Sequence, residues 1–300
     1  MAVYKQSYKR FEGTLTDERW RFTILTRYAF QTVFESRLLG SFFSLCLAPH
    51  LVALGLIYLR NSPGALGALN LPFLRFLEID GAFFLTIYEI ETYLSFLLVT
   101  FIGPSLIAPD LANNALPLYL SRPFSKHEYI IGKLSVLIVL TSLITWVPGL
   151  FVLALQTNQA GLAWLSENVR VVIGIVVGSW IWITTISLMA LALSAWVKMR
   201  PAAMFSLFGA FFVAASFGNM ANALLELNPP WGLLIDLNMT MRGLWQWLLL
   251  GRTEFGMAFA PAGGAAGLPS WTALLSVASF SAISFVLLVK KIRACEVVRL

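Results

Sequence analysis

Residues 171–197 read VVIGIVVGSWIWITTISLMALALSAWV and contain no Asp, Glu, Lys or Arg. A helix needs about 20 apolar residues to cross the hydrocarbon core of a bilayer, so this run is long enough to span it. The run is also continuous, whereas the strands of a membrane β-barrel alternate polar and apolar residues. We therefore expect a transmembrane helix here.

The composition of the whole chain agrees with this expectation. Of 300 residues, 58% are hydrophobic and 12% are charged, which excludes a soluble globular domain. Similar apolar runs lie on either side of the first, and together they predict an all-α integral membrane protein. We expect six transmembrane helices near residues 38–59, 82–108, 131–155, 170–196, 201–223 and 270–290. They form one domain, residues 38–290, between an N-terminal segment of residues 1–37 and a tail of residues 291–300.

The distribution of Lys and Arg predicts the orientation of the chain. Sixteen of the 21 basic residues fall in the N-terminus, the second-to-third and fourth-to-fifth connections, and the C-terminal tail. The other five are Arg60, Arg75, Arg170, Arg242 and Arg252. Basic residues accumulate on the cytoplasmic side, so both termini are predicted to be cytoplasmic in a cell inner membrane. The net charge of +6 follows from this topology and does not indicate a nucleic-acid partner.

The N-terminal segment contains a helical pattern before the first span. Trp20, Ile24 and Tyr28 recur at a spacing of four residues, which predicts a helix over residues 16–37 with an apolar stripe. Such a helix can lie in the membrane interface. Because Arg27 falls within the stripe, an ordinary cytoplasmic helix is the alternative.

The predicted external connection, residues 224–269, also contains an apolar segment. Residues 244–250 include Trp245 and Trp247 but are too few to span a bilayer. We expect this segment to lie in the outer leaflet or re-enter it. The small-residue tract that follows, residues 261–267, is expected to be a flexible link to the last span.

A polar and basic segment, residues 107–133, separates the second and third spans. Its first half has apolar residues at helical spacing, and Pro123 is expected to stop the helix. Ser125 and Glu128 are spaced as a capping box at the start of the third span. Physical chemistry alone also allows a simpler interpretation, namely a well-terminated cytoplasmic loop whose basic residues lie near lipid headgroups.

This segment resembles the second-to-third-span segment of the ABC-two family of ABC exporter permeases. The resemblance covers about 25 residues, and the six-span topology, cytoplasmic termini and long last external loop extend it. Asp110 stands where the family more often has Glu, and Asn114 and Ala115 stand where Gly and Thr are common. The resemblance is carried by Asp110, Ala115, Leu116, Tyr119, Leu120, Ser121, Arg122, Pro123, Ser125, Lys126, Tyr129, Gly132 and Lys133.

The resemblance implies a cytoplasmic coupling segment, residues 109–130, with a coupling helix of roughly residues 110–120 that docks on a separate ATP-binding subunit. It further implies two ATP-binding subunits for each complex and a second permease copy, identical or related. The residues expected to couple to the ATPase are Asp110, Leu111, Asn114, Ala115, Leu116, Tyr119, Leu120, Arg122, Pro123 and Lys126. ATP and magnesium are expected in the partner, because Gly132 and Lys133 lack the rest of a phosphate-binding loop.

The predicted function is the permease subunit of an ATP-driven ABC exporter embedded in the lipid bilayer, with no catalytic, cofactor-binding or metal-ligating residue of its own. The alternative is a non-transporting membrane anchor or assembly subunit that uses the same fold to hold or drive an envelope complex. An intramembrane hydrolase is a distant third interpretation. Its candidate residues Ser105, His50 and His127 have no evident partners, and no zinc-ligand spacing is visible.

Two other features within the spans are candidates for function. Glu89 and Glu91 are expected near the outer end of the second span, where they could contact a cation or substrate, since acids inside a membrane are costly. An interfacial position in the aromatic belt explains them equally well. Gly174 and Gly178 form a GxxxG pair that permits close helix packing, and a dimer contact is one possible use.

Overall fold

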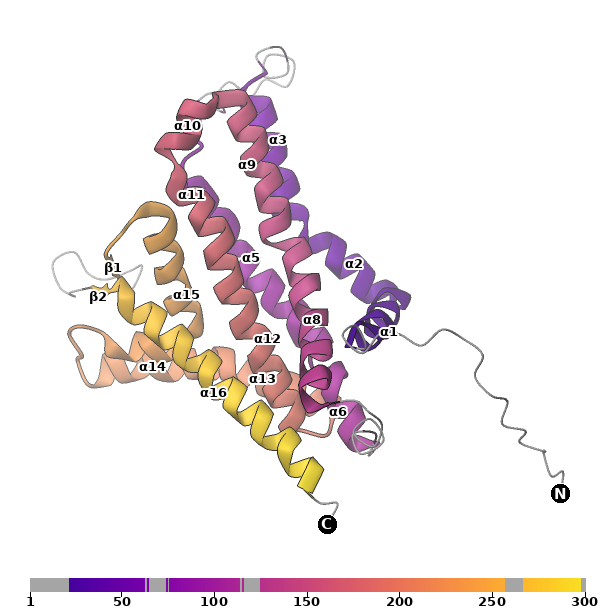
Figure 1. Cartoon of the computed structure of the whole chain (residues 1–300). Coiled ribbons are helices and arrows are strands. Elements are labelled where there is room, and N and C mark those ends of the chain that lie inside the picture. The colour runs from indigo at the N-terminus through magenta and orange to yellow at the C-terminus, as the bar shows by residue number, and fades with distance from the viewer. Residues whose placement is uncertain are drawn as a thin grey trace, which may run out of the picture.

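The computed structural model describes residues 22–62, 64, 74, 76–113, 115, 125–256 and 267–297, and these are almost entirely helical (Figure 1). Six helical segments are long and apolar enough to cross a membrane. They are residues 37–60, 81–112, 126–160, 169–196, 200–224 and 270–292. The number and order of the predicted spans are confirmed, and the third span is longer at both ends than predicted. The chain is an all-α, multi-pass membrane protein.

Five of the six spans are interrupted helices, and the sixth is continuous. The first comprises α2 (Arg37–Cys46) and α3 (Ala48–Arg60), the second α5 (Gly81–Ile102) and α6 (Pro104–Ala112), and the third α8 (Lys126–Ile144) and α9 (Trp146–Ala160). The fourth comprises α11 (Val169–Ile173), the π-helical turn η3 (Gly174–Gly178) and α12 (Ser179–Trp196). The fifth comprises α13 (Arg200–Phe208), η4 (Gly209–Val213) and α14 (Ala214–Leu224), and the sixth is α16 (Ser270–Val297).

Local sequence explains the interruptions of the first two spans. Pro49 lies in the first turn of α3 and Pro104 begins α6. Proline has no backbone N–H to continue the preceding helix, but it fits the first turn of a new one. The first span therefore changes direction near Leu47 (Figure 1), and the second is interrupted at Gly103.

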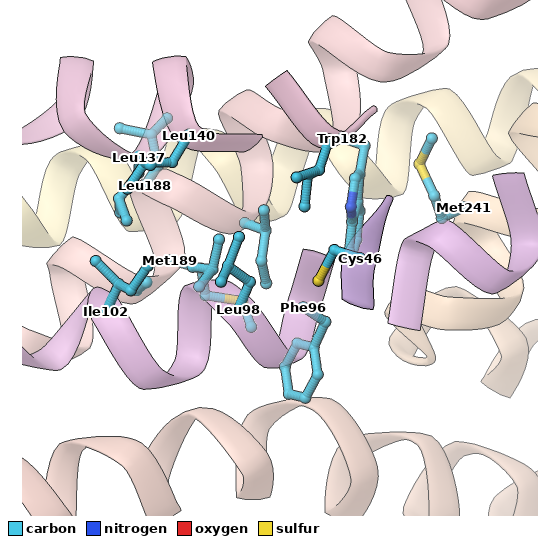
Figure 2. Close-up of a cluster of buried hydrophobic side chains, with 14 of the residues drawn as sticks. Cys46, Phe96, Leu98, Ile102, Leu137, Leu140, Trp182, Leu188, Met189 and Met241 are labelled. Carbon is cyan, nitrogen blue, oxygen red and sulfur yellow. The ribbon is translucent and has the colours of Figure 1, made fainter. Parts of the chain in front are cut away.

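The second, third and fourth spans form the core of the bundle. More than half of the apolar window of each is buried (61%, 56% and 61%), against 28% or less for the other three spans. Figure 2 shows part of this core, in which Leu137 and Leu140 of α8 lie close to Leu188 of α12. The first, fifth and sixth spans therefore cover the outside of a central three-span unit.

Helix α1 (Phe22–Glu35) precedes the first span and packs against α8. Thr26 donates a hydrogen bond to the Gly132 carbonyl at 3.1 Å, and Val33 is buried. Ile24 and Tyr28 of the predicted apolar stripe are exposed, and Trp20 lies outside the described residues. A helix is present where one was predicted; its place in the membrane interface stays a prediction.

The connection before the last span folds into the bundle. It contains η5 (Trp231–Ile235), α15 (Leu237–Trp245) and η6 (Gln246–Leu250), which pack between α5, η3 and α16 (Figure 1). The short strands β1 (Glu254–Phe255) and β2 (Leu268–Pro269) pair antiparallel ahead of α16. Trp245 is 1% exposed. The apolar segment is therefore an interior part of the protein; of the tract predicted as a link, residues 261–266 lie outside the described residues.

The GxxxG pair of the fourth span is used within this chain. A Cβ atom at Gly174 would overlap the Leu249 side chain, and one at Gly178 would overlap the Trp245 ring. Without side chains, the two glycines let η6 and α15 approach the fourth span closely. The face that could have served a dimer is thus occupied by the protein's own helices.

The predicted coupling helix differs from the structure at its start. Asp110 was expected to begin a helix, but it lies in the last turn of α6, which ends at Ala112 and is followed by a turn at Asn113. Helix α6 continues the second span beyond the interruption at Gly103, so the span of residues 81–112 already includes Asp110. Residues 114 and 116–124 lie outside the described part of the chain. On the other side of this gap, the capping box of Ser125 and Glu128 is confirmed.

Candidate functional site

Two polar clusters lie inside the described bundle, and the first joins the two ends of the predicted coupling segment. The Lys133 ammonium of α8 lies 2.9 Å from Oδ2 of Asp110 in α6. The Tyr129 hydroxyl donates a hydrogen bond to the same carboxylate oxygen at 2.7 Å. The ammonium also lies 5.6 Å from the centre of the Tyr129 ring. We name Asp110, Tyr129 and Lys133 the basal cluster.

The ion pair of the basal cluster is largely buried, unlike an ion pair at a protein surface. The side chains of Lys133 and Asp110 are only 11% and 17% exposed. Tyr129 and Lys133 are one helical turn apart and both face α6, so the Lys133 side chain is directed to Asp110. A buried pair with a further hydrogen bond is hard to break, since loss of one partner leaves an uncompensated charge.

Helix α6 is also attached to the fourth span. The Ala108 backbone N–H donates to the Ser194 hydroxyl at 2.9 Å, and that hydroxyl donates to the Pro104 carbonyl at 3.2 Å. A small hydroxyl of α12 thus holds the helix that carries Asp110. The basal cluster is consequently connected to the second, third and fourth spans, which form the core.

Four of the ten predicted coupling residues are described. Asp110 belongs to the basal cluster, and Leu111 is half-buried against the core. The Ala115 N–H donates to the Asp110 carbonyl at 2.8 Å, and Lys126 lies in the first turn of α8. The six that lie outside the described residues are Asn114, Leu116, Tyr119, Leu120, Arg122 and Pro123.

The second cluster lies in the middle of the bundle around Glu91. This residue is near the centre of the 22-residue helix α5 and is 1% exposed. Its Oε2 atom lies 3.9 Å from Nδ1 of His50 in α3, which is also 1% exposed. Glu91 therefore points into the protein, away from the outer contact expected from the sequence.

Aromatic rings enclose this pair. The Tyr88 ring stacks on Trp245 with centroids 4.7 Å apart and meets the His50 ring edge-on at 6.0 Å. The Trp245 indole donates to the Thr92 hydroxyl at 3.2 Å. On the far side, a Cβ atom at Gly149 would overlap the Tyr88 hydroxyl. We name Glu91, His50 and Tyr88 the central cluster.

The central cluster has polar atoms without hydrogen bonds. Among the described residues, neither carboxylate oxygen of Glu91 and neither ring nitrogen of His50 has a hydrogen-bond partner. Leaving such groups unpaired typically costs about 1–3 kcal/mol each. The π-helical turn η3 of the fourth span contacts Trp245 through Gly178, and π-helical turns are frequent at functional sites.

Glu89, the other acid expected at the outer end, has a different role. Its Oε1 atom accepts a hydrogen bond from Nε of Arg242 in α15 at 2.7 Å, and both side chains are about one-third exposed. Nearby, the Asn238 amide donates to the Tyr93 hydroxyl at 2.5 Å. These contacts border a cavity of about 80 Å³. Glu89 therefore joins the inserted helix to the second span.

Asp236 begins that inserted helix and lies outside the six spans. Its Oδ1 atom accepts from the backbone N–H groups of Asn238 and Met239 at 2.9 and 3.0 Å, and the Asn219 amide donates to its Oδ2 at 3.5 Å. Burial raises the pKa of the Asp236 carboxyl, while these hydrogen bonds act in the opposite direction. Asp236 is an N-cap that fixes α15 to the fifth span.

Ser105 and His127 are the remaining candidate residues from the sequence. The Ser105 hydroxyl of α6 donates to the carbonyl of Ile102, the last residue of α5, at 2.6 Å, and His127 is exposed on α8. Over the ranges that the structure describes, no group of three or more His, Cys, Asp and Glu side chains is placed to hold a metal ion. The two clusters above are thus the candidate sites.

Sequence reasoning missed the central cluster as a unit. The signal was present in the lone His50 of the first span and in Glu91 of the second, but 40 positions of sequence separate them and no local pattern joins them. Comparison with known proteins does not identify a family for the chain. No protein-family model and no curated protein matches the chain.

Proposed function

We propose that this chain is the membrane-spanning permease subunit of an ATP-driven exporter of the ABC-two kind. It works in a cell inner membrane with both termini in the cytoplasm and couples to separate ATP-binding subunits. The observation that carries the proposal is the basal cluster. It closes the connection between the second and third spans, the segment whose sequence resembles the coupling region of that family.

The basal cluster gives this connection the mechanical property that coupling needs. Asp110 lies three residues before the turn at Asn113, and Tyr129 lies four residues after the helix cap Ser125. The ion pair and the hydrogen bond to Asp110 tie these two ends together. A displacement of the intervening residues therefore moves α6 and α8 together. The hydrogen bond between Ala108 and Ser194 extends this displacement to α12.

In the proposed complex each component has its own role. ATP and magnesium bind in two partner ATPases, and the side chains of Leu116 and Arg122 contact them. Closure of the ATPases moves the coupling segments of two permease copies, and the core spans respond because they are joined at the basal cluster. Few charges line the spans, which suits a lipid-like or amphipathic cargo.

Co-purification tests this function. The full chain is extracted in mild detergent from its native host, and retained proteins are identified by mass spectrometry. We expect an ABC ATPase, and we expect Arg122→Glu and Leu116→Ala to reduce its retention. Arg252→Glu is the matched control, because Arg252 is exposed in the connection before the last span and should not affect retention.

Three outcomes would contradict the proposal. The first is that no ATPase is retained by the wild-type chain. The second is that the ATPase is retained equally by the wild type and by both coupling variants. The third is retention of envelope proteins in place of an ATPase, which would favour the non-transporting anchor.

A further inference from the structure

We propose that Glu91 and His50 form a membrane-embedded proton-binding site that holds one exchangeable proton between the second and first spans. This inference does not rest on the exporter function, because it follows from the central cluster alone. The ligand is a proton, which needs no cavity and can occupy the space between two closely packed helices.

Geometry is the first argument. The carboxylate and the imidazole face each other at 3.9 Å, and both side chains are almost fully buried. Neither group is satisfied by another partner in the described chain. A small contraction of the bundle brings Glu91 Oε2 and His50 Nδ1 within hydrogen-bond distance, where one proton serves both atoms.

Charge is the second argument. With no proton the pair carries one negative charge, with two protons it carries one positive charge, and with one proton it is neutral. A single buried charge in a membrane core costs several kcal/mol, so the pair retains one proton across the neutral pH range. At 3.9 Å the neutral arrangement, a carboxylic acid facing a neutral imidazole, suits the apolar surroundings better than a separated ion pair.

Transfer within the pair needs no other reactant. The O–H bond of Glu91 breaks as the lone pair of His50 Nδ1 takes up the proton, which gives a carboxylate and an imidazolium. The reverse step restores the neutral pair. Exchange with water takes place when the interface between α3 and α5 opens near the bend at Leu47.

Among the described residues, His50 is the one titratable group that lies within ion-pair distance of Glu91. Cys46 of α2 lies within electrostatic reach of Glu91, but its sulfur lies 3.8 Å from the Leu94 carbonyl and is fully buried (Figure 2). Helix α12 and η6 carry no charged residue. Several charged groups lie on elements that contact α5. Lys133 pairs with Asp110, Arg242 with Glu89, Arg200 donates to the Phe101 carbonyl, and Glu128 caps α8 at Ser125. Arg37, Arg60, Lys126 and Arg170 lie within two residues of the ends of their helices.

Infrared spectroscopy of the full chain in lipid nanodiscs tests the site. At about pH 8, where exposed carboxyls are ionised, we expect a carboxylic acid C=O stretching band in the wild type. The band should disappear in Glu91→Gln and persist in Glu89→Gln, the matched control. Transfer to D₂O should shift it to lower frequency. A band of unchanged intensity in Glu91→Gln would overturn the proposal, and so would the absence of any such band in the wild type.

A second variant tests the role of the imidazole and keeps Glu91 in place. In His50→Gln the carboxylic acid loses its neighbour, so the band should move in frequency. An unmoved band would show that His50 does not share the proton. Because this variant retains the carboxyl, it remains informative even if Glu91→Gln fails to fold.

Discussion

The Lys133 ammonium and the Asp110 carboxylate form a buried ion pair, 2.9 Å apart, between the helices that enter and leave the predicted coupling segment. Loss of one partner should leave the other charge unpaired in an apolar environment. We expect Asp110→Leu or Lys133→Met alone to lower the free energy of unfolding by about 3–5 kcal/mol. Thermal unfolding in detergent measures this loss.

The double variant Asp110→Leu with Lys133→Met separates charge from packing. With both charges removed, no uncompensated group remains, so its stability should lie much closer to the wild type than that of either single variant. If the two single losses simply add in the double variant, the pair does not act as a buried unit.

The partly exposed pair of Glu89 and Arg242 should behave differently. Both side chains are about one-third exposed and are screened by water. We expect Arg242→Gln to change stability by at most about 1 kcal/mol, and added salt should reduce the difference from the wild type. A loss as large as that of Lys133→Met would contradict this assignment.

At Gly178 the helix α15 lies in close contact with the fourth span. A Cβ atom there would overlap the Trp245 ring, so Gly178→Ala should destabilise the fold by about 1–3 kcal/mol through overpacking. Gly209→Ala is the matched control, because nothing lies within 4 Å of its added methyl group. That variant should be neutral or slightly stabilising. Equal effects of the two changes on the unfolding temperature would argue against the close contact.

Cys46 reports on the packing between the first and second spans. Its side chain is fully buried, so in a Cys295→Ser background it should resist a maleimide until the protein is unfolded. Asn61→Cys, at the exposed end of α3, is the control and should react at once. Rapid labelling of Cys46 in the folded protein would contradict its burial beside Glu91.

The membrane architecture was predictable because its signal is local. Each span is an uncharged run of sufficient length, and the capping box of Ser125 and Glu128 is a short motif that specifies where a helix begins. These features depend on the sequence within a few residues. The length of a helix and its start could therefore be inferred before any packing was known.

The clusters were not predictable, because each depends on contacts between distant residues. Glu91 could be singled out as costly, but its direction depends on which face of α5 meets His50. Lys133 pairs with Asp110 only because α6 packs against α8, and the sequence near Lys133 does not specify that contact. The same holds for Gly174 and Gly178, whose packing partners Leu249 and Trp245 lie about 70 residues further along the chain.

Site-specific photo-crosslinking in native membranes tests the central claim, ATPase coupling, most directly. A photoreactive amino acid is placed at Leu116 in the predicted coupling segment and, as control, at Leu162, an exposed residue in helix α10 (Leu162–Glu167) at the opposite end of the bundle. We predict that an ABC ATP-binding subunit is crosslinked from Leu116 and not from Leu162. Failure to capture such a subunit from Leu116, or equal capture from both positions, would contradict the account.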